Sequence, residues 1–256
     1  MQEHDTWLKD KTKERHYPFH QASAYVAGAE RHPQLNIVYA TLPLLDDASI
    51  AALKADPTAV LLIDTYNTHG MAEQRSLFVQ LMEEGCDTPA IIGRAYGAIT
   101  NDDLVLHSST DIGPLSIDGL GDGIFIADED GGREDLVCRT AFDILQATRT
   151  RTSKTEYISC PSCGRTLFDL QETTAKIRAR TSHLKGIKIG IMGCIVNGPG
   201  EMADADYGYV GTGPGVITLY KEKEVVKRNV PTAQAVDALI DLIREHGDWA
   251  ELEVDQ

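Results

Sequence analysis

Two kinds of hydrophobic pattern alternate along the chain. Continuous apolar runs with the length of a buried strand occupy residues 59–64, 89–93 and 123–127. Between and after them, residues 73–84 and 134–148 place apolar side chains at helical spacing. Strands that alternate with helices predict an α/β fold with parallel strands in this part of the chain.

A polar run at residues 149–154 is the best candidate for a domain boundary. Beyond it we expect a compact α/β domain over residues 151–256, with a helix opened by Pro231 near its end. Its other elements are predicted as strands at 155–158, 186–191, 207–210 and 216–220 and a helix at 167–180. The charged start, residues 1–18, is expected to be mobile.

Composition narrows the class of protein. With 256 residues, of which 42% are hydrophobic, the chain is long enough for one large domain or two ordinary ones, each with a hydrophobic core. It contains no apolar stretch of about 18 residues and no apolar segment near its start, which predicts a cytoplasmic protein without a membrane span. Five cysteines, an odd number, argue against a disulfide framework and favour reduced thiols that are available to hold a metal.

The net charge of −15 is placed unevenly. Residues 1–150 carry 11 Lys and Arg against 24 Asp and Glu, whereas residues 151–256 carry 13 against 15. Neither part shows the basic stripe that phosphate backbones require, so nucleic acid and anionic membranes are poor candidates for partners. A local pocket for a small anionic substrate is compatible with this charge.

Two turn-rich segments carry the only chemistry that the sequence specifies. Residues 159–165 read SCPSCGR after a strand-like run, and residues 192–201 read MGCIVNGPGE after isoleucines at every second position. Gly198, Pro199 and Gly200 argue against a helix and predict an irregular loop whose backbone can approach an inorganic core. The candidate ligands at these two strand ends are Cys160, Cys163, Cys194 and Glu201, arranged like the mouth of an iron–sulfur site.

The cysteine segments are also compatible with sites other than an iron–sulfur cluster. Cys-x-x-Cys alone also suits structural zinc, but three cysteines with a carboxylate are unusual for zinc, and a thioredoxin-like dithiol would need neither Cys194 nor Glu201. Cys86 and Cys138 are expected to be small buried hydrophobic residues. Arg165 is equally compatible with facing an anionic ligand beside the site and with pairing to an acid at a helix start.

With both segments in view, the chain resembles the C-terminal part of the 4-hydroxy-3-methylbut-2-enyl diphosphate synthases, oxidoreductases of the methylerythritol phosphate route to isoprenoids. The string at residues 192–201 is highly specific, and the resemblance is good over residues 115–245. It implies a partial TIM-barrel-like α/β region followed by a compact α/β [4Fe–4S] domain similar to the cluster domains of sulfite and nitrite reductases. Residues 19–150 would be the end of the domain inserted in the plant-type form and the last barrel strand and helix, and residues 151–256 the cluster domain.

The resemblance also implies an activity. Cys160, Cys163, Cys194 and Glu201 would hold the [4Fe–4S] cluster, and two electrons from ferredoxin or flavodoxin would open the ring of 2-C-methyl-D-erythritol 2,4-cyclodiphosphate with loss of water. Asn197 would donate a hydrogen bond near the reacting iron or support the loop. The chain is too short for the complete barrel of the family, so we expect a C-terminal portion, and a homodimer is expected only by analogy. The alternative is a non-catalytic fragment that binds a cluster or transfers electrons.

Overall fold

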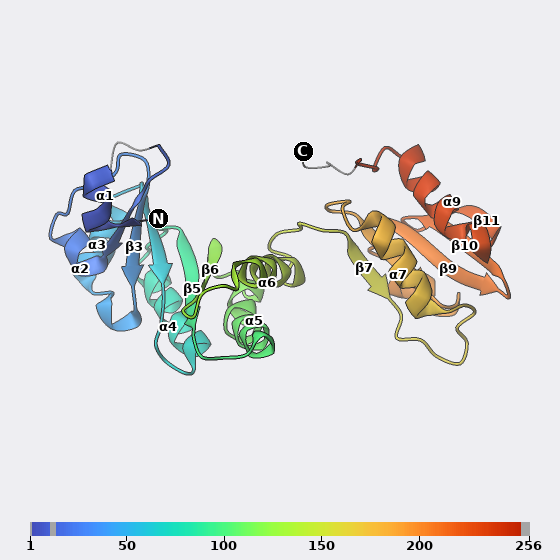
Figure 1. Ribbon diagram of the computed structural model, residues 1–256, viewed down its shortest axis with the longest axis horizontal. Coiled ribbons are helices and arrows are strands. Elements are labelled where there is room, and N and C mark those ends of the chain that lie inside the picture. Colours follow the sequence, from blue (N-terminus) through green and yellow to red (C-terminus); the bar gives the residue numbers. More distant parts are fainter. Residues whose placement is uncertain (1, 11–13, 252–256) are drawn as a thin grey trace. The chain divides into compact units, whose positions relative to one another are not determined.

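The chain forms two compact units. The computed structural model describes residues 2–10 and 14–251, and its contacts divide the chain into Met1–Arg151 and Thr152–Gln256 (blue to green and yellow to red in Figure 1). Each unit combines its own sheet with helices, so the predicted α/β class is confirmed. Among the described residues, none of the helices has the length and apolar character that a membrane span requires.

The sheet of the first unit has six parallel strands that follow one another in chain order. They are β1 (Gln2–Glu3), β2 (Pro18–Gln21), β3 (Asn36–Ala40), β4 (Ala59–Ile63), β5 (Ala90–Tyr96) and β6 (Gly123–Asp128). A helix follows every one of these strands before the next strand begins. Unbroken sequential order of this kind is the arrangement of a β/α barrel segment and differs from a doubly wound sheet, whose order reverses.

Helices bury one face of this sheet. They are α1 (His4–Asp10), α2 (Ala22–Val26), α3 (Asp47–Lys54), α4 (Gly70–Glu83), α5 (Asn101–Ile117) and α6 (Glu134–Ala147), with a short 3₁₀ turn at Leu42–Leu44. Val38, Leu61 and Ile92 point to the helical side and are at most 1% exposed. On the opposite face Val60 is partly exposed and Phe125 is 39% exposed.

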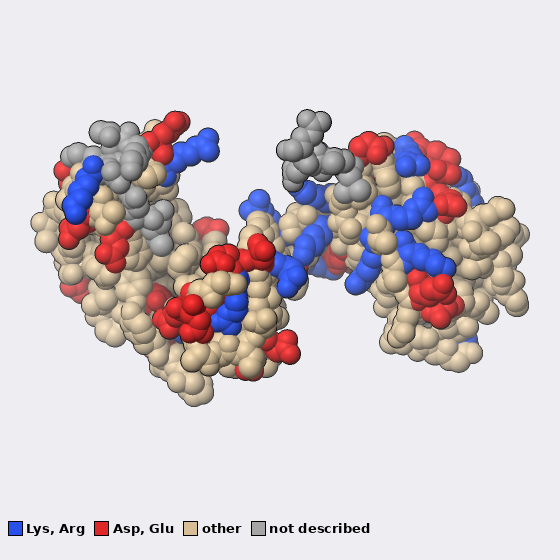
Figure 2. Space-filling view, in the orientation of Figure 1, with Lys and Arg blue, Asp and Glu red and all other residues tan. Residues whose placement is uncertain are grey.

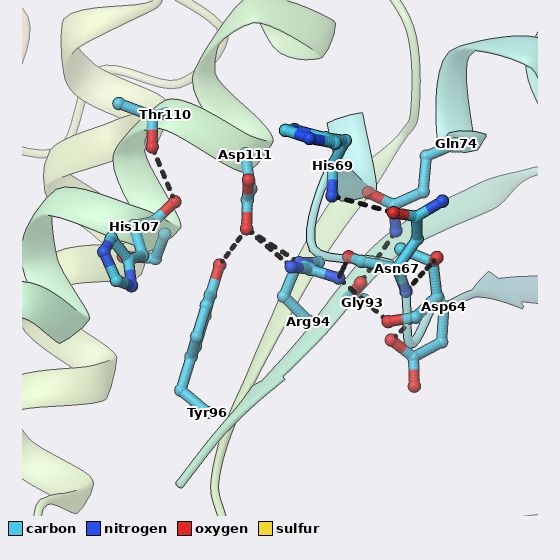
Figure 3. A network of polar contacts seen from close by, with 12 residues as sticks. Asp64, Asn67, His69, Gln74, Gly93, Arg94, Tyr96, His107, Thr110 and Asp111 are labelled. Carbon is cyan, nitrogen blue, oxygen red and sulfur yellow. Dashed lines mark hydrogen bonds and ion pairs between the residues drawn. The ribbon is translucent and has the colours of Figure 1, made fainter. Parts of the chain in front are cut away.

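A buried network ties the carboxyl ends of β4 and β5 to two helices (Figure 3). The Arg94 guanidinium donates from Nε to Asp111 of α5 at 2.8 Å and from Nη1 to the Thr65 carbonyl at 2.8 Å. The Tyr96 hydroxyl donates to the same Asp111 oxygen at 2.9 Å. A Cβ on Gly70, the first residue of α4, would lie 2.5 Å from Arg94 Nη1, so a glycine is needed where the guanidinium meets this helix. The network therefore fixes both loops at this edge of the sheet.

The start of the chain, for which mobility is predicted, contains regular structure. β1 pairs in parallel with β2, and Trp7 of α1 is 2% exposed, with its Nε1 donating to the His16 carbonyl at 3.0 Å. The apolar ring of Trp7 anchors a segment whose other residues are mainly polar, and mobility of residues 1–18 stays a prediction. Residues 1 and 11–13 of the predicted mobile segment lie outside the described residues.

The second unit has a mixed sheet in the order β11-β10-β9-β8-β7. Its strands are β7 (Glu156–Ser159), β8 (Lys188–Met192), β9 (Tyr207–Gly213), β10 (Val216–Lys221) and β11 (Glu224–Pro231). The first three are parallel, and the last two join as antiparallel strands. The helices are α7 (Leu170–Thr181), the single turn α8 (Gly198–Glu201) and α9 (Thr232–Glu245).

Both faces of this second sheet are covered. On one face, α7 and α9 pack over Ile189, Ile191 and Tyr209, which are fully buried. On the other, Met192 and Val210 pack with Met202, which follows α8. This double cover holds the carboxyl ends of β7 and β8 in place, where the candidate ligands lie.

Candidate metal centre

Two neighbouring parallel strands bring the cysteine segments together. Ser159 at the end of β7 is paired with Ile191 of β8, so Cys160 and Cys194 leave the sheet at the same edge. A cavity of about 110 Å³ opens there. Its lining residues are Cys160, Pro161, Ser162, Cys163, Arg165, Cys194, Asn197, Gly198 and Glu201. Every candidate ligand from the sequence, together with Asn197, therefore faces one pocket.

The first cysteine segment forms a tight turn held by backbone bonds. Cys160 N–H donates to the Ile191 carbonyl at 3.4 Å, which continues the pairing of β7 with β8 past the strand end. Ser162 has φ +67°, a left-handed conformation that side chains rarely adopt and that reverses the chain between the two cysteines. Cys163 is consequently exposed at the mouth of the pocket, while Cys160 is partly buried beneath it.

The second segment contains one helical turn, so the prediction of a wholly irregular loop is wrong. The Asn197 carbonyl accepts the N–H groups of Gly200 and Glu201, both at 3.0 Å, and these bonds form α8. Pro199 lies within the first positions of this turn, where its missing N–H costs no hydrogen bond. Met202 follows and is 2% exposed. Buried Met202 stabilises the turn α8, whose two glycines would otherwise destabilise it. The exposed residue Glu201 thereby lines the pocket.

The electrostatics of the pocket favour thiolate at its rim. Hydrogen bonds from the Arg165 backbone and side chain hold the pKa of the Cys163 thiol below its ordinary value. The thiolate is the form of cysteine that binds metals. Of the two roles considered for Arg165, the structure places it in the pocket wall beside Cys163.

The three pocket cysteines are free thiols, as the donor set of an iron–sulfur cluster requires. Within the described residues, no three His, Cys, Asp or Glu side chains are gathered in a way that could hold a metal ion. The other two cysteines lie in the first unit: Cys86 is buried as expected, but Cys138 is exposed on α6, so that expectation is wrong. Cys138 lies on the outer side of an amphipathic helix, whose buried residues are Thr140 and Ile144.

Comparison with known proteins agrees with this geometry. Residues 156–245 match the family described as the GcpE protein C-terminal domain. This match covers most of the second unit. The chain is also 54% identical over 216 residues to the 4-hydroxy-3-methylbut-2-en-1-yl diphosphate synthase (flavodoxin) of Parabacteroides distasonis, covering 84% of this chain and 35% of that protein.

A plant relative extends the comparison. The chloroplastic 4-hydroxy-3-methylbut-2-en-1-yl diphosphate synthase (ferredoxin) of Arabidopsis thaliana is 55% identical over 179 residues, which are 69% of this chain and 24% of that protein. The chain thus spans about a third of the length of its bacterial relatives and a quarter of this plant relative.

The second unit also contains site residues that the sequence did not reveal. Thr166 bonds to the backbone of Cys163, and Gly211 of β9 lies against the loop that carries Cys194. A hydroxyl three residues after a cysteine is the only local signal for Thr166. No local signal marks Gly211, because its role depends on strand packing. On the face seen in Figure 2, Lys and Arg are interspersed with Asp and Glu over this domain.

Proposed function

We propose that this chain is the cluster-bearing C-terminal portion of a 4-hydroxy-3-methylbut-2-en-1-yl diphosphate synthase. In this proposal Cys160, Cys163, Cys194 and Glu201 hold a [4Fe–4S] cluster. The observation that carries it is that these four residues all line one pocket at the shared edge of β7 and β8. The names of relatives that match most of this chain support the same assignment.

Three thiolates and one carboxylate suit a cluster that transfers electrons and also binds a substrate. When bound, the cluster supplies two electrons for the reductive ring opening and dehydration of 2-C-methyl-D-erythritol 2,4-cyclodiphosphate. A carboxylate is a harder and more exchangeable ligand than a thiolate, so Glu201 leaves one corner of the site open to substrate. Its exposure at the end of α8 lets it swing without disturbing the buried Met202. Asn197 lines the same pocket and is proposed to orient the substrate there.

The complete reaction requires more than this chain is proposed to supply. The bacterial relatives are more than twice as long, and the matched part of the present chain spans 35% of the one from Parabacteroides distasonis. We propose that the remaining length of such a protein binds the diphosphate. Flavodoxin is named for the bacterial relatives and ferredoxin for the plant ones, so one of these is the proposed electron donor. A homodimer and a cytoplasmic location remain predictions from the sequence.

Anaerobic reconstitution with iron and sulfide tests the cluster. We expect bound iron and acid-labile sulfide in equal amounts and the broad visible absorbance of an iron–sulfur protein. Cys194→Ser should lose most of both, while Cys138→Ser, which changes an exposed cysteine of the first unit, should retain them. Stoichiometric zinc in place of iron would support the structural-zinc alternative, and unchanged iron in Cys194→Ser would overturn the ligand assignment.

The short span of the chain favours a second candidate, a fragment that binds a cluster without catalysis. Turnover of the cyclodiphosphate under reducing, anaerobic conditions distinguishes the two. The reconstituted chain is assayed alone and with the N-terminal two-thirds of a bacterial relative supplied as a separate polypeptide. Product formed only in the mixture would support the synthase portion, and no product in either assay would favour the non-catalytic fragment.

A further inference from the structure

Thr166 lies between the two loops that carry the candidate ligands. Its Oγ1 accepts a hydrogen bond from the Cys163 N–H at 3.1 Å and lies 3.2 Å from the Ser162 hydroxyl. Its own N–H donates to the Cys163 carbonyl at 3.0 Å. Two opposed bonds between the same pair of residues lock the turn that presents the Cys163 thiol.

The other side of Thr166 meets the loop that leads to Cys194. A Cβ built on Gly193 would lie 2.7 Å from Thr166 Cγ2 and 2.9 Å from its Oγ1, closer than real side chains come. Leu167 N–H donates to the Gly193 carbonyl at 3.0 Å, which joins the segment after Thr166 to the same residue. Gly193 is confined from behind as well, because a Cβ on Gly211 of β9 would lie 2.5 Å from its carbonyl oxygen.

Gly193 also contacts the first cysteine directly. Its N–H donates to Cys160 Sγ at 3.3 Å, the type of bond that stabilises a metal-bound sulfur. The position of Gly193 therefore affects both the Cys160 sulfur and the start of the Cys194 loop, and Thr166 is the side chain against which Gly193 rests. A substitution at Thr166 would therefore shift the positions of Cys160, Cys163 and Cys194 without removing any of these ligands.

We propose that Thr166 is a positioning residue that sets the spacing of Cys163 and Cys194 around a bound cluster. The hydroxyl carries this role, because it holds the Cys163 backbone, and the methyl group only packs beside Gly193. This inference rests on the proposed function, because it assumes that the pocket holds a cluster. It assigns Thr166 no contact with substrate.

Two substitutions separate the two halves of the side chain. Thr166→Val keeps the branched shape and removes the hydroxyl, and Thr166→Ser keeps the hydroxyl and removes the methyl. Thr212→Val is the matched control, since Thr212 is also partly exposed in the same unit but shares its hydroxyl with Thr218 on β10, at 3.0 Å. The full chain is used for each variant, with circular dichroism to verify folding before reconstitution.

The measurement is the rate at which the reconstituted protein loses iron to an Fe(II) chelator under anaerobic conditions. Partners that orient metal ligands typically change metal affinity by 10- to 100-fold, so Thr166→Val should lose iron about 10-fold faster or more. Thr166→Ser and Thr212→Val should stay within about 3-fold of the unchanged chain, below the usual range of such effects. The electron paramagnetic resonance spectrum of the reduced cluster should change in Thr166→Val only, a readout that a general loss of stability would not give.

The outcomes separate this inference from the proposed function. If the unchanged chain binds no cluster, the proposed function fails. If it binds one and Thr166→Val keeps both its iron and its spectrum, the positioning role is refuted. Should Thr166→Val fail to fold, Thr166→Ser decides: retention like that of the unchanged chain supports the role of the hydroxyl, and loss about 10-fold faster contradicts it.

Discussion

Truncation of Met202 should loosen the sheet beneath the ligand loops more than any exposed change. Met202 is 2% exposed and fills the space over two strand glycines. A Cβ on Gly190 would lie 2.6 Å from Met202 Cβ, and one on Gly208 would lie 2.6 Å from its sulfur. Met202→Ala therefore leaves a cavity, and the two glycines beneath it have no side chains that could fill the space.

The expected cost follows from core truncations in general. Replacing a buried methionine by alanine costs about 2–5 kcal/mol, with larger values where the site cannot collapse. The glycine floor places Met202→Ala at roughly 3–4 kcal/mol on that scale. A loss of this size raises the population of the unfolded unit by roughly 100- to 1000-fold, since about 1.4 kcal/mol corresponds to a factor of ten.

Native-state hydrogen exchange measures this loss within the second unit. The slowest amides of β8 and β9 should exchange roughly 100- to 1000-fold faster in Met202→Ala. Met202→Leu, which conserves volume, should cost less than about 1.5 kcal/mol. Met82→Ala is the exposed control in the first unit, at 60% exposure, and should leave the exchange of β8 unchanged. A Met202→Ala effect below about 1 kcal/mol would refute the anchoring role assigned to Met202.

Two further changes test the structure elsewhere in this unit. Gly193→Ala should place a methyl group 2.7 Å from Thr166 Cγ2 and cost about 1–3 kcal/mol by overpacking; a chemical denaturation midpoint equal to that of the unchanged chain would contradict the close approach. The pKa of Asp248 is held below its ordinary value by hydrogen bonds from Tyr207 and Lys221. Because that pKa is depressed on folding, the stabilisation is present above the unfolded value of about 3.9 and is lost as pH falls through the folded value. Asp248→Asn should therefore be less stable than the unchanged chain near neutral pH and equal to it in acid, and a stability difference independent of pH would argue against this pairing.

The sequence predicts several strands well because their apolar runs have strand length, although Ala59–Ile63 is nearly all buried and Gly123–Asp128 is mostly part-exposed. Ala59–Ile63 and Gly123–Asp128 form where apolar runs of strand length occur, and the amphipathic helix Glu134–Ala147 lies within the predicted range. The strand before Cys194 likewise forms where isoleucines alternate. In each case a local pattern matches the environment that the fold supplies.

Elements with mixed signals were missed or mistaken. The helix α5, Asn101–Ile117, contains Pro114 and several polar residues, so periodicity alone did not reveal it. The edge strand β11, Glu224–Pro231, is mostly exposed and carries charges, which resemble a loop in sequence. Within the site, the donor residues were predicted from spacing, but the single turn α8 was not, because Met202 stabilises it by a tertiary contact that no local rule contains.

We propose that three thiolates and one carboxylate hold a [4Fe–4S] cluster in the pocket at the carboxyl ends of β7 and β8. Mössbauer spectroscopy of the chain, reconstituted anaerobically with isotopically enriched iron, tests it most directly. We expect a [4Fe–4S] spectrum in which one iron site differs from the other three, and loss of that difference when Glu201→Cys supplies a fourth thiolate. A spectrum with four equivalent sites in the unchanged chain, or no cluster iron at all, would contradict it.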